Sequence, residues 1–379
     1  MSESSLKQLV RDRKATIFYI HGTARSGSTI AEVVFSRLCD RAIHQPWRGI
    51  LQHRGGRNRP NKLKFDEDIY EAGCELISKH IREILSTQSH ATVLVKELAG
   101  FFKPSIWKSW VEIPEKFILT IRDPCSQYLS WLAAMTDKIF HGQGKIQENY
   151  KMVLEKAEIV EDSILPPEWE GTTITCNQNA WNALLNDALY LYEYLPETAS
   201  KLTIIEASLL RKDPDYVVAK AIEQLRLNIS PDWFSPDNLE RHSQGQIVDL
   251  RDVNRPMVRK ARNSKRIEPL SQENKFDCSL LPAKSRQHLQ QIIPIYLDLL
   301  YAPENVSMPS LEQLQKPVAG NGSLKLQQAN PFLAYAIALF YQQQLMSNAK
   351  HHFSSVSNLQ KAVDLYWQPS NIQESVKQI

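Results

Sequence analysis

The chain has 379 residues, of which 42% are hydrophobic and 23% are charged. This balance is typical of a globular protein and too apolar for a disordered one. The formal net charge of +3 is too small to indicate a nucleic-acid-binding protein. No apolar run approaches the roughly 18 residues that a membrane-spanning helix needs, so we expect neither nucleic acid nor membrane as a partner.

The cysteines and the first residues predict a cytoplasmic location. Five cysteines, an odd number, are scattered along the chain without a C-x-x-C pair, which indicates reduced thiols rather than a disulfide framework. They are Cys39, Cys74, Cys125, Cys176 and Cys278. The polar start MSESSLKQLVRDRK lacks the apolar core of a signal peptide.

The segment Thr16–Phe35 is the most informative part of the sequence. Its β-branched and aromatic residues predict a strand, which a turn bounded by Gly22 and Gly27 separates from a helix over about residues 29–40. The turn GTARSGST has the spacing of the phosphate-binding pattern G-x-x-x-x-G-K-[ST], but Ser28 stands where that pattern has lysine. Because this lysine contacts the terminal phosphates of ATP or GTP, the sequence predicts a phosphate-like ligand of another kind.

The next segments continue the alternation of strands and helices. Residues 41–47 predict a second strand that ends at Pro46. The following stretch, about residues 48–64, is rich in Gly and Arg with little to bury, and we interpret it as a mobile flap. Residues 66–86 have helical spacing, and ATVLVKEL at residues 91–98 predicts a buried strand.

The alternation of strands and helices extends to about residue 227. Further strands are predicted at residues 116–124 and 201–210, and further helices at residues 126–139, 172–195 and 213–227. This order indicates an α/β fold with a mainly parallel central sheet flanked by helices, whose ligand sits at the carboxyl ends of the strands. We expect one domain over residues 1–302, then a linker and a helical appendage over residues 303–379.

Two short patterns follow predicted strands. The loop after the first strand is a basic residue, Ser, Gly and two hydroxyl residues, namely Arg25, Ser26, Gly27, Ser28 and Thr29. Arg122 stands at a later strand end, and Ser130 follows eight residues after it. Both patterns resemble the sulfotransferases that use 3′-phosphoadenosine 5′-phosphosulfate (PAPS), in which the loop has this order and a strand-end arginine is followed by a serine at the same spacing.

A third segment is similar to the same family. A strand ends in the acidic residue Glu206, Leu209 follows, and a helix begins near Asp213 and Pro214. The resemblance covers roughly residues 16–227, and it implies a P-loop sulfotransferase-like fold in which this third segment has a structural role.

The resemblance also implies the reaction. A sulfuryl group would pass from PAPS to a hydroxyl or amine of a small-molecule acceptor by in-line transfer without a metal, leaving 3′,5′-bisphosphoadenosine. Natural-product tailoring is the expected setting. Arg25 to Thr29 would bind the 5′-phosphosulfate, with Arg25 near the leaving-group oxygens, and Arg122 with Ser130 would bind the 3′-phosphate.

The family also covers the cofactor with a late basic loop. The only later candidate is the basic stretch at about residues 251–266, where Arg259, Arg262 and Lys265 are the candidate contacts. It lacks the glycines of the G-x-x-G-x-x-K form known from cytosolic members, and solvated surface charge is the competing explanation.

The proton acceptor is left open between two principal candidates. Glu97 ends the strand ATVLVKEL beside Lys96, and His44 leaves the second strand just before Gln45. Either side chain would emerge at a strand end, where a base for the acceptor hydroxyl is needed. His53, His141 or no single base are further alternatives, and we interpret His21 as a core or supporting hydrogen bonder.

Two other functions remain as alternatives. A P-loop small-molecule kinase, or another nucleotide-binding protein with an atypical loop, would bind ATP with magnesium. A catalytically silent scaffold would bind 3′,5′-bisphosphoadenosine without turnover. The apolar helix predicted at residues 330–346 is a candidate contact for a homo-oligomer.

Overall fold

The computed structural model describes most of the first 136 residues and parts of the rest. The described segments are residues 2–55, 66–100, 102–136, 180–188, 190–191, 201–227, 246–250 and scattered positions from 267 to 307. The chain divides into two compact units. The first comprises Met1–Thr120, Asn179–Thr203 and Ala221–Ile267, and the second comprises Ile121–Gln178, Ile204–Lys220 and Glu268–Ile379. The predicted boundary at residue 303 stays a prediction.

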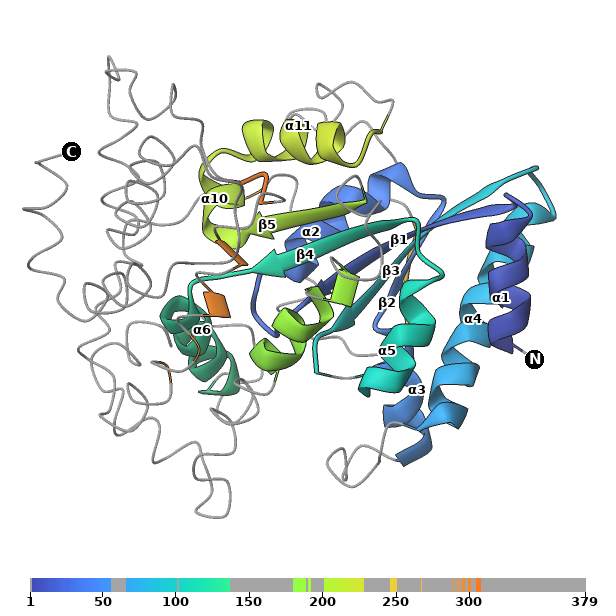
Figure 1. Cartoon of the computed structure of the whole chain (residues 1–379), viewed down its shortest axis with the longest axis horizontal. Coiled ribbons are helices and arrows are strands. Elements are labelled where there is room, and N and C mark those ends of the chain that lie inside the picture. Colours follow the sequence, from blue (N-terminus) through green and yellow to red (C-terminus); the bar gives the residue numbers. More distant parts are fainter. Residues whose placement is uncertain are drawn as a thin grey trace, which may run out of the picture. The chain divides into compact units, whose positions relative to one another are not determined.

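A six-stranded, all-parallel sheet with flanking helices organises the fold, which confirms the α/β prediction (Figure 1). The strand order is β5-β4-β1-β3-β2-β6. The strands are β1 Ala15–Gly22, β2 Arg41–His44, β3 Ala91–Leu98, β4 Lys116–Ile121, β5 Leu202–Glu206 and β6 Gln246–Asp249. Parallel strands need crossover connections, and these place the helices on the sheet faces.

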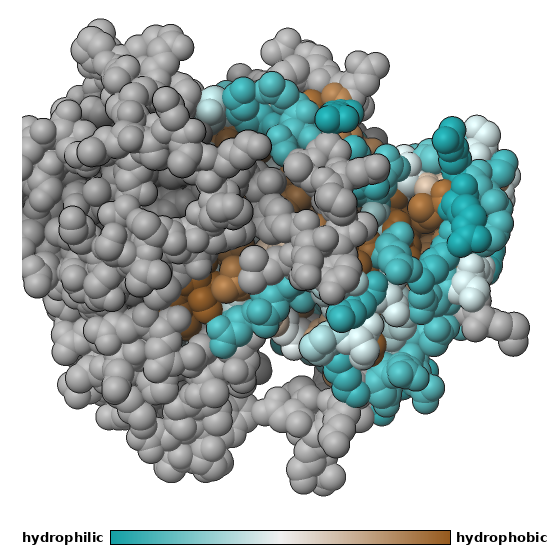
Figure 2. Space-filling view, viewed as in Figure 1, coloured by the Kyte–Doolittle hydropathy of each residue, from teal (hydrophilic) through white to brown (hydrophobic). Residues whose placement is uncertain are grey.

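Helices follow nearly every strand. Among the described residues they are α1 Ser2–Arg11, α2 Ser28–Phe35, the 3-10 helix η1 Ser36–Leu38, α3 Pro46–Gly55, α4 Glu67–Leu85, α5 Pro104–Val111, α6 Pro124–Thr136, α10 Ala207–Lys212 and α11 Pro214–Gln224. Residues 180–188 are also helical. Hydrophilic side chains gather on the outer surface around α1 and α4 (Figure 2).

The strand register of the first unit decides which side chains share a face of the sheet. Ile20 pairs with Lys96, and Lys96 pairs with His44. Register neighbours in parallel strands point to the same side, and successive residues point to opposite sides. Lys96 and His44 therefore lie on the face that α2 covers. His21 and Glu97, also register partners, lie on the other face, which α5 covers (Figure 1).

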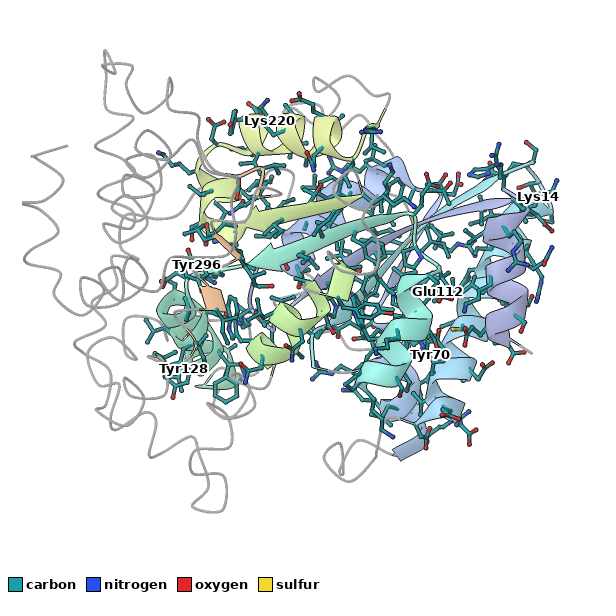
Figure 3. All side chains as sticks on the ribbon, in the orientation of Figure 1. Lys14, Tyr70, Glu112, Tyr128, Lys220 and Tyr296 are labelled. Carbon is teal, nitrogen blue, oxygen red and sulfur yellow. The ribbon has the colours of Figure 1, made fainter. Side chains whose placement is uncertain are left out.

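Large aromatic side chains form the core between the sheet and α3, α4 and α5. Tyr19 of β1 meets Trp110 edge-on with ring centroids 5.3 Å apart, and Trp110 in turn meets Trp47 at 4.7 Å. The Trp47 indole Nε1 donates a hydrogen bond of 3.0 Å to the carbonyl of Tyr70. Tyr70 belongs to α4 (Figure 3). Offset and edge-on packing of buried rings adds to the hydrophobic stabilisation, so Trp47 fixes α3 against α4 and α5.

The structure corrects the predicted flap. Residues 46–55 form the helix α3, whereas the remainder of the predicted flap, residues 56–64, lies outside the described residues. Trp47 is fully buried and Leu51 is 7% exposed, so this segment has an apolar face at i, i+4 spacing. Pro46 also stands at the first helical position, which it favours.

The structure differs from the sequence-based prediction at three further elements. The predicted strand over residues 201–210 ends at Glu206, and α10 begins there. Helix α1 and strand β6 were not predicted from the sequence. The other predicted strands and the helix over residues 66–86 are confirmed within a few residues.

Gly73 of α4 allows the close approach of Trp47. A Cβ atom at this glycine would lie 2.1 Å from Trp47 Nε1 and 2.2 Å from Trp47 Cδ1. We therefore expect Gly73→Ala to lower the free energy of unfolding by about 1–3 kcal/mol because the buried indole must shift. Chemical denaturation of both proteins measures this difference.

The control for Gly73→Ala is the same substitution in a Trp47→Ala background. With the indole removed, alanine should stabilise the helix by about 0.5–1 kcal/mol, as it does at ordinary helix positions. Equal effects of Gly73→Ala in the two backgrounds would contradict the packing described.

Candidate functional site

The loop between β1 and α2 has the backbone of an anion-binding turn. Arg25 and Gly27 adopt left-handed conformations, with φ of 68° and 83°. The N–H groups of Ile30 and Ala31 donate to the carbonyl of Gly27 and begin the hydrogen-bond ladder of α2. The preceding N–H groups of the first turn have no intrahelical acceptor, and this end of the helix carries partial positive charge. The loop can therefore receive an anion at the carboxyl end of β1.

Close packing against β4 fixes the start of this loop. A Cβ atom on Gly22 would lie 2.2 Å from Thr120 Oγ1, so only glycine fits there. Ser26 Oγ lies 2.7 Å from the same Thr120 hydroxyl, and Ser26 is fully buried. The Ser26 side chain thus braces the loop from inside, whereas Arg25 and Thr29 are half-buried. Ser28 is 4% exposed.

A lysine from β3 reaches the first turn of α2. Lys96 Nζ donates a hydrogen bond of 2.8 Å to Thr29 Oγ1 and lies 3.6 Å from Glu32 Oε2. Ser28 occupies the lysine position of the P-loop pattern, and the loop has no lysine of its own. Lys96 instead brings an amino group to this loop from β3. Lys96 is only 1% exposed, so its amino group is buried beside the first turn of α2.

Glu32 of α2 joins Lys96 to His44. Its Oε1 and Oε2 atoms lie 2.8 and 2.6 Å from His44 Nδ1, and both residues are at most 2% exposed. A buried carboxylate is tolerable when it accepts charge-assisted hydrogen bonds from cationic or donor partners. Glu32 was not predicted as a site residue, although a single acidic residue within the apolar helix STIAEVVF was an available signal.

Glu97 and His21 belong to a different group on the other face. Glu97 accepts hydrogen bonds from the N–H groups of Arg48 at 3.3 Å and Leu98 at 3.1 Å, and it is fully buried. His21 Nε2 lies 2.8 Å from Asp187 Oδ2, and its ring stacks on Trp107. The prediction that His21 is a supporting core residue fits this geometry, and Asp187 was not singled out.

The two principal base candidates are therefore separated by the sheet. His44 stands on the α2 face with Lys96, while Glu97 stands on the face of α5. Because successive residues of a strand point to opposite sides, Lys96 and Glu97 lie on opposite faces of the sheet. His53 lies on the exposed part of α3 and hydrogen-bonds the carbonyl of Leu250. His141 lies outside the described residues.

In the second unit, Arg122 and Ser130 flank the start of α6. Arg122 is half-buried directly after β4, and Ser130 is 2% exposed in the second turn of the helix. Asp123 caps α6 by accepting a hydrogen bond of 2.8 Å from the Ser126 N–H. The backbone N–H of Asp123 in turn donates to Glu206 Oε1 at 3.3 Å, so Glu206 fixes the segment that carries Arg122.

Glu206 is a fully buried carboxyl at the end of β5. Its Oε2 accepts hydrogen bonds of 2.7 and 2.8 Å from the N–H groups of Ser208 and Leu209, which cap α10. Burial raises the pKa of Glu206 to about 7, because desolvation of the carboxylate outweighs the N–H donors and the charge of Arg122, which lower it. The hydrogen bonds that cap α10 agree with the structural role expected for the acidic residue at this strand end.

The predicted late basic loop follows β6. Arg259, Arg262 and Lys265 lie outside the described residues, although β6 ends just before that loop begins. Among the residues that the structure describes, no group of three or more His, Cys, Asp or Glu side chains could hold a metal ion. Within the same part of the chain, no helix is long and apolar enough to cross a membrane.

Comparison with known proteins gives no family for this chain. No protein-family model matches it, and no curated protein matches it.

The buried Glu206 carboxyl predicts a pH dependence of stability. Because its pKa is about 7 in the folded chain and near 4.5 in the unfolded one, the folded state holds the proton to higher pH. The stabilisation is complete below about pH 4.5 and is lost as pH rises through about 7. Between pH 4.5 and 8 the free energy of unfolding of the wild type should therefore fall by roughly 3 kcal/mol more than that of Glu206→Gln.

Urea denaturation at several pH values measures this difference. Glu223→Gln, a change of an exposed carboxyl on α11, is the matched control and should follow the wild-type curve. Parallel curves for the wild type and Glu206→Gln would show that Glu206 titrates as it does in the unfolded chain.

Proposed function

We propose that this protein is a PAPS-dependent sulfotransferase with a P-loop sulfotransferase fold. The observation that carries the proposal is the loop from β1 to α2, with its left-handed Arg25 and Gly27, together with Lys96 Nζ 2.8 Å from Thr29 Oγ1. This combination supplies helix N–H donors and a cation for a phosphate-like group. Its lysine comes from a position that the ATP-binding pattern does not use.

The 5′-phosphosulfate is assigned to the loop. Backbone N–H groups at the start of α2 would bind the phosphate, and Lys96 would balance the charge of the transferring sulfuryl group. Arg25 would stabilise the bridging oxygen, on which negative charge accumulates as the S–O bond breaks. With these two cations present, the proposed in-line transfer uses no metal ion. Positioning and electrostatic stabilisation provide most of the rate enhancement in such reactions.

The remaining roles complete the proposal. Arg122 would hold the 3′-phosphate of the cofactor through paired N–H donors, and Ser130 would add a hydroxyl contact. The acceptor is a hydroxyl or amine of a small molecule, with natural-product tailoring as the setting. The product, 3′,5′-bisphosphoadenosine, keeps both phosphates, so its binding reports on the cofactor site without an acceptor.

Binding of 3′,5′-bisphosphoadenosine tests this proposal directly. We expect calorimetry to show binding without magnesium and weaker binding of ATP with or without magnesium. Arg122→Ala should weaken the binding about 10- to 100-fold because a charge-assisted contact to the 3′-phosphate is lost. Arg25→Ala should lower the rate of labelled sulfuryl transfer from PAPS by roughly 10²–10³ with a smaller effect on binding.

Arg11→Ala, on the exposed end of α1, is the matched control for loss of an arginine and should behave as wild type. Tight, magnesium-dependent binding of ATP would instead favour a kinase. Binding of 3′,5′-bisphosphoadenosine without any transfer would favour a silent scaffold. Normal transfer by both arginine variants would overturn the assigned roles.

A further inference from the structure

One buried carboxylate orients the histidine on the α2 face of the sheet. Glu32 stands in the second turn of α2 and is fully buried, and both of its oxygens lie within 2.8 Å of His44 Nδ1. Lys96 Nζ lies 3.6 Å from Glu32 Oε2, so the carboxylate is shared by an imidazole and an ammonium group. The Lys96 charge favours the ionised form of Glu32.

This contact decides which nitrogen of His44 can take a proton. An ionised carboxylate only accepts hydrogen bonds, so His44 Nδ1 carries the hydrogen and donates it to Glu32. In the neutral imidazole the lone pair then lies on Nε2, on the opposite side of the ring. When Nε2 accepts a proton, the imidazolium forms beside a carboxylate that stabilises it, as in other histidine–carboxylate pairs.

Three charged or titratable groups bear on His44 from neighbouring elements. Glu32 approaches from α2 and Lys96 from β3. Asp249 of β6 is the register partner of His44 on the other side of β2, so it shares the same face. Lys96 is hydrogen-bonded to Thr29, which lies at the end of the loop between β1 and α2. This hydrogen bond connects the side chains around His44 to that loop.

We propose that His44 is the proton acceptor of the transfer and that Glu32 is the residue that positions it. The inference rests on the proposed sulfotransferase function. The acceptor oxygen forms its bond to sulfur while its proton passes to His44 Nε2. The bond from sulfur to the bridging oxygen breaks, and its electron pair leaves on the 5′-phosphate beside Arg25. The positive charge on His44 is then balanced by Glu32.

The same geometry makes Glu97 the weaker candidate. Its two oxygens accept backbone hydrogen bonds from α3 and from its own strand end, and these stabilise the ionised form without aligning it to the loop. It lies on the face of the sheet that α2 does not cover. His44 shares Glu32 with Lys96, the residue that reaches Thr29, so one carboxylate sets the geometry of both the base and the cation.

The test compares Glu32→Gln, Glu32→Asp and His44→Gln with the wild type, using labelled PAPS and two phenols as acceptors. One phenol is 2-naphthol, which keeps its proton near neutral pH, and the other is 4-nitrophenol, which is largely ionised at pH 8. We expect kcat for 2-naphthol to fall about 10²–10⁴-fold in His44→Gln and roughly 10–100-fold in Glu32→Gln. The losses for 4-nitrophenol should be much smaller, because its proton is already gone.

Further readouts separate positioning from a structural effect. KM for PAPS and the affinity for 3′,5′-bisphosphoadenosine should change less than about threefold in His44→Gln, since His44 is not assigned to cofactor binding. In Glu32→Gln the acid limb of the kcat profile should move to lower pH, because the imidazolium loses its counter-ion. Glu32→Asp keeps the charge and should recover part of the rate.

Glu83→Gln is the matched control, because His80 Nδ1 lies 3.2 Å from Glu83 Oε2 in a more exposed pair on α4. It should show wild-type kinetics. Equal losses for both phenols without a shift of the acid limb would make Glu32 merely structural and overturn the inference, as would wild-type kinetics in His44→Gln. A wild type that neither binds 3′,5′-bisphosphoadenosine nor consumes PAPS would instead overturn the proposed function itself, and the inference with it.

Discussion

The buried carboxylate of Glu32 is the constraint on which the geometry around the loop between β1 and α2 depends. An isolated carboxylate in the interior is strongly unfavourable, and Glu32 is tolerated because Lys96 and His44 converge on it. These partners come from β3 and β2, so one charge holds the first turns of α2 against the carboxyl ends of two strands. Lys96 gains a fixed position from which it reaches Thr29, and the loop gains a cation without a lysine of its own.

The alternation of side chains along β3 divides the chemistry of this sheet edge between two faces. Lys96 points to α2 and the phosphate loop, while its neighbour Glu97 points to α3 and α5. His21 joins Glu97 on that second face, where Asp187 and Trp107 hold it. The second face thus resembles a packed aromatic core in which Glu97 and His21 are hydrogen-bonded. The first face places the Glu32 carboxylate, the His44 imidazole and the Lys96 side chain beside the start of α2, and this asymmetry is why the proposed reaction is assigned there.

Patterns of neighbouring residues in the sequence predicted the sheet and the loop between β1 and α2. They could not predict side-chain contacts between elements that are distant in the sequence. The strand, turn and helix around Gly22 and Gly27 follow from residue types that are adjacent in sequence. The helix α3 was mistaken for a flap because its glycines and arginines outweighed a two-residue apolar face at Trp47 and Leu51. Strand β6 is only four residues long, too short for a clear alternation. The pairing of Glu32 with His44 joins residues twelve positions apart on different elements, and only the tertiary fold brings them together.

A crystal structure with 3′,5′-bisphosphoadenosine would locate both phosphates and so decide whether the proposed cofactor site exists. We expect the 5′-phosphate at the start of α2, within hydrogen-bonding distance of the loop N–H groups and of Lys96 Nζ. We expect the 3′-phosphate on Arg122. A nucleotide bound elsewhere, or a 5′-phosphate held without the loop between β1 and α2, would contradict the proposal.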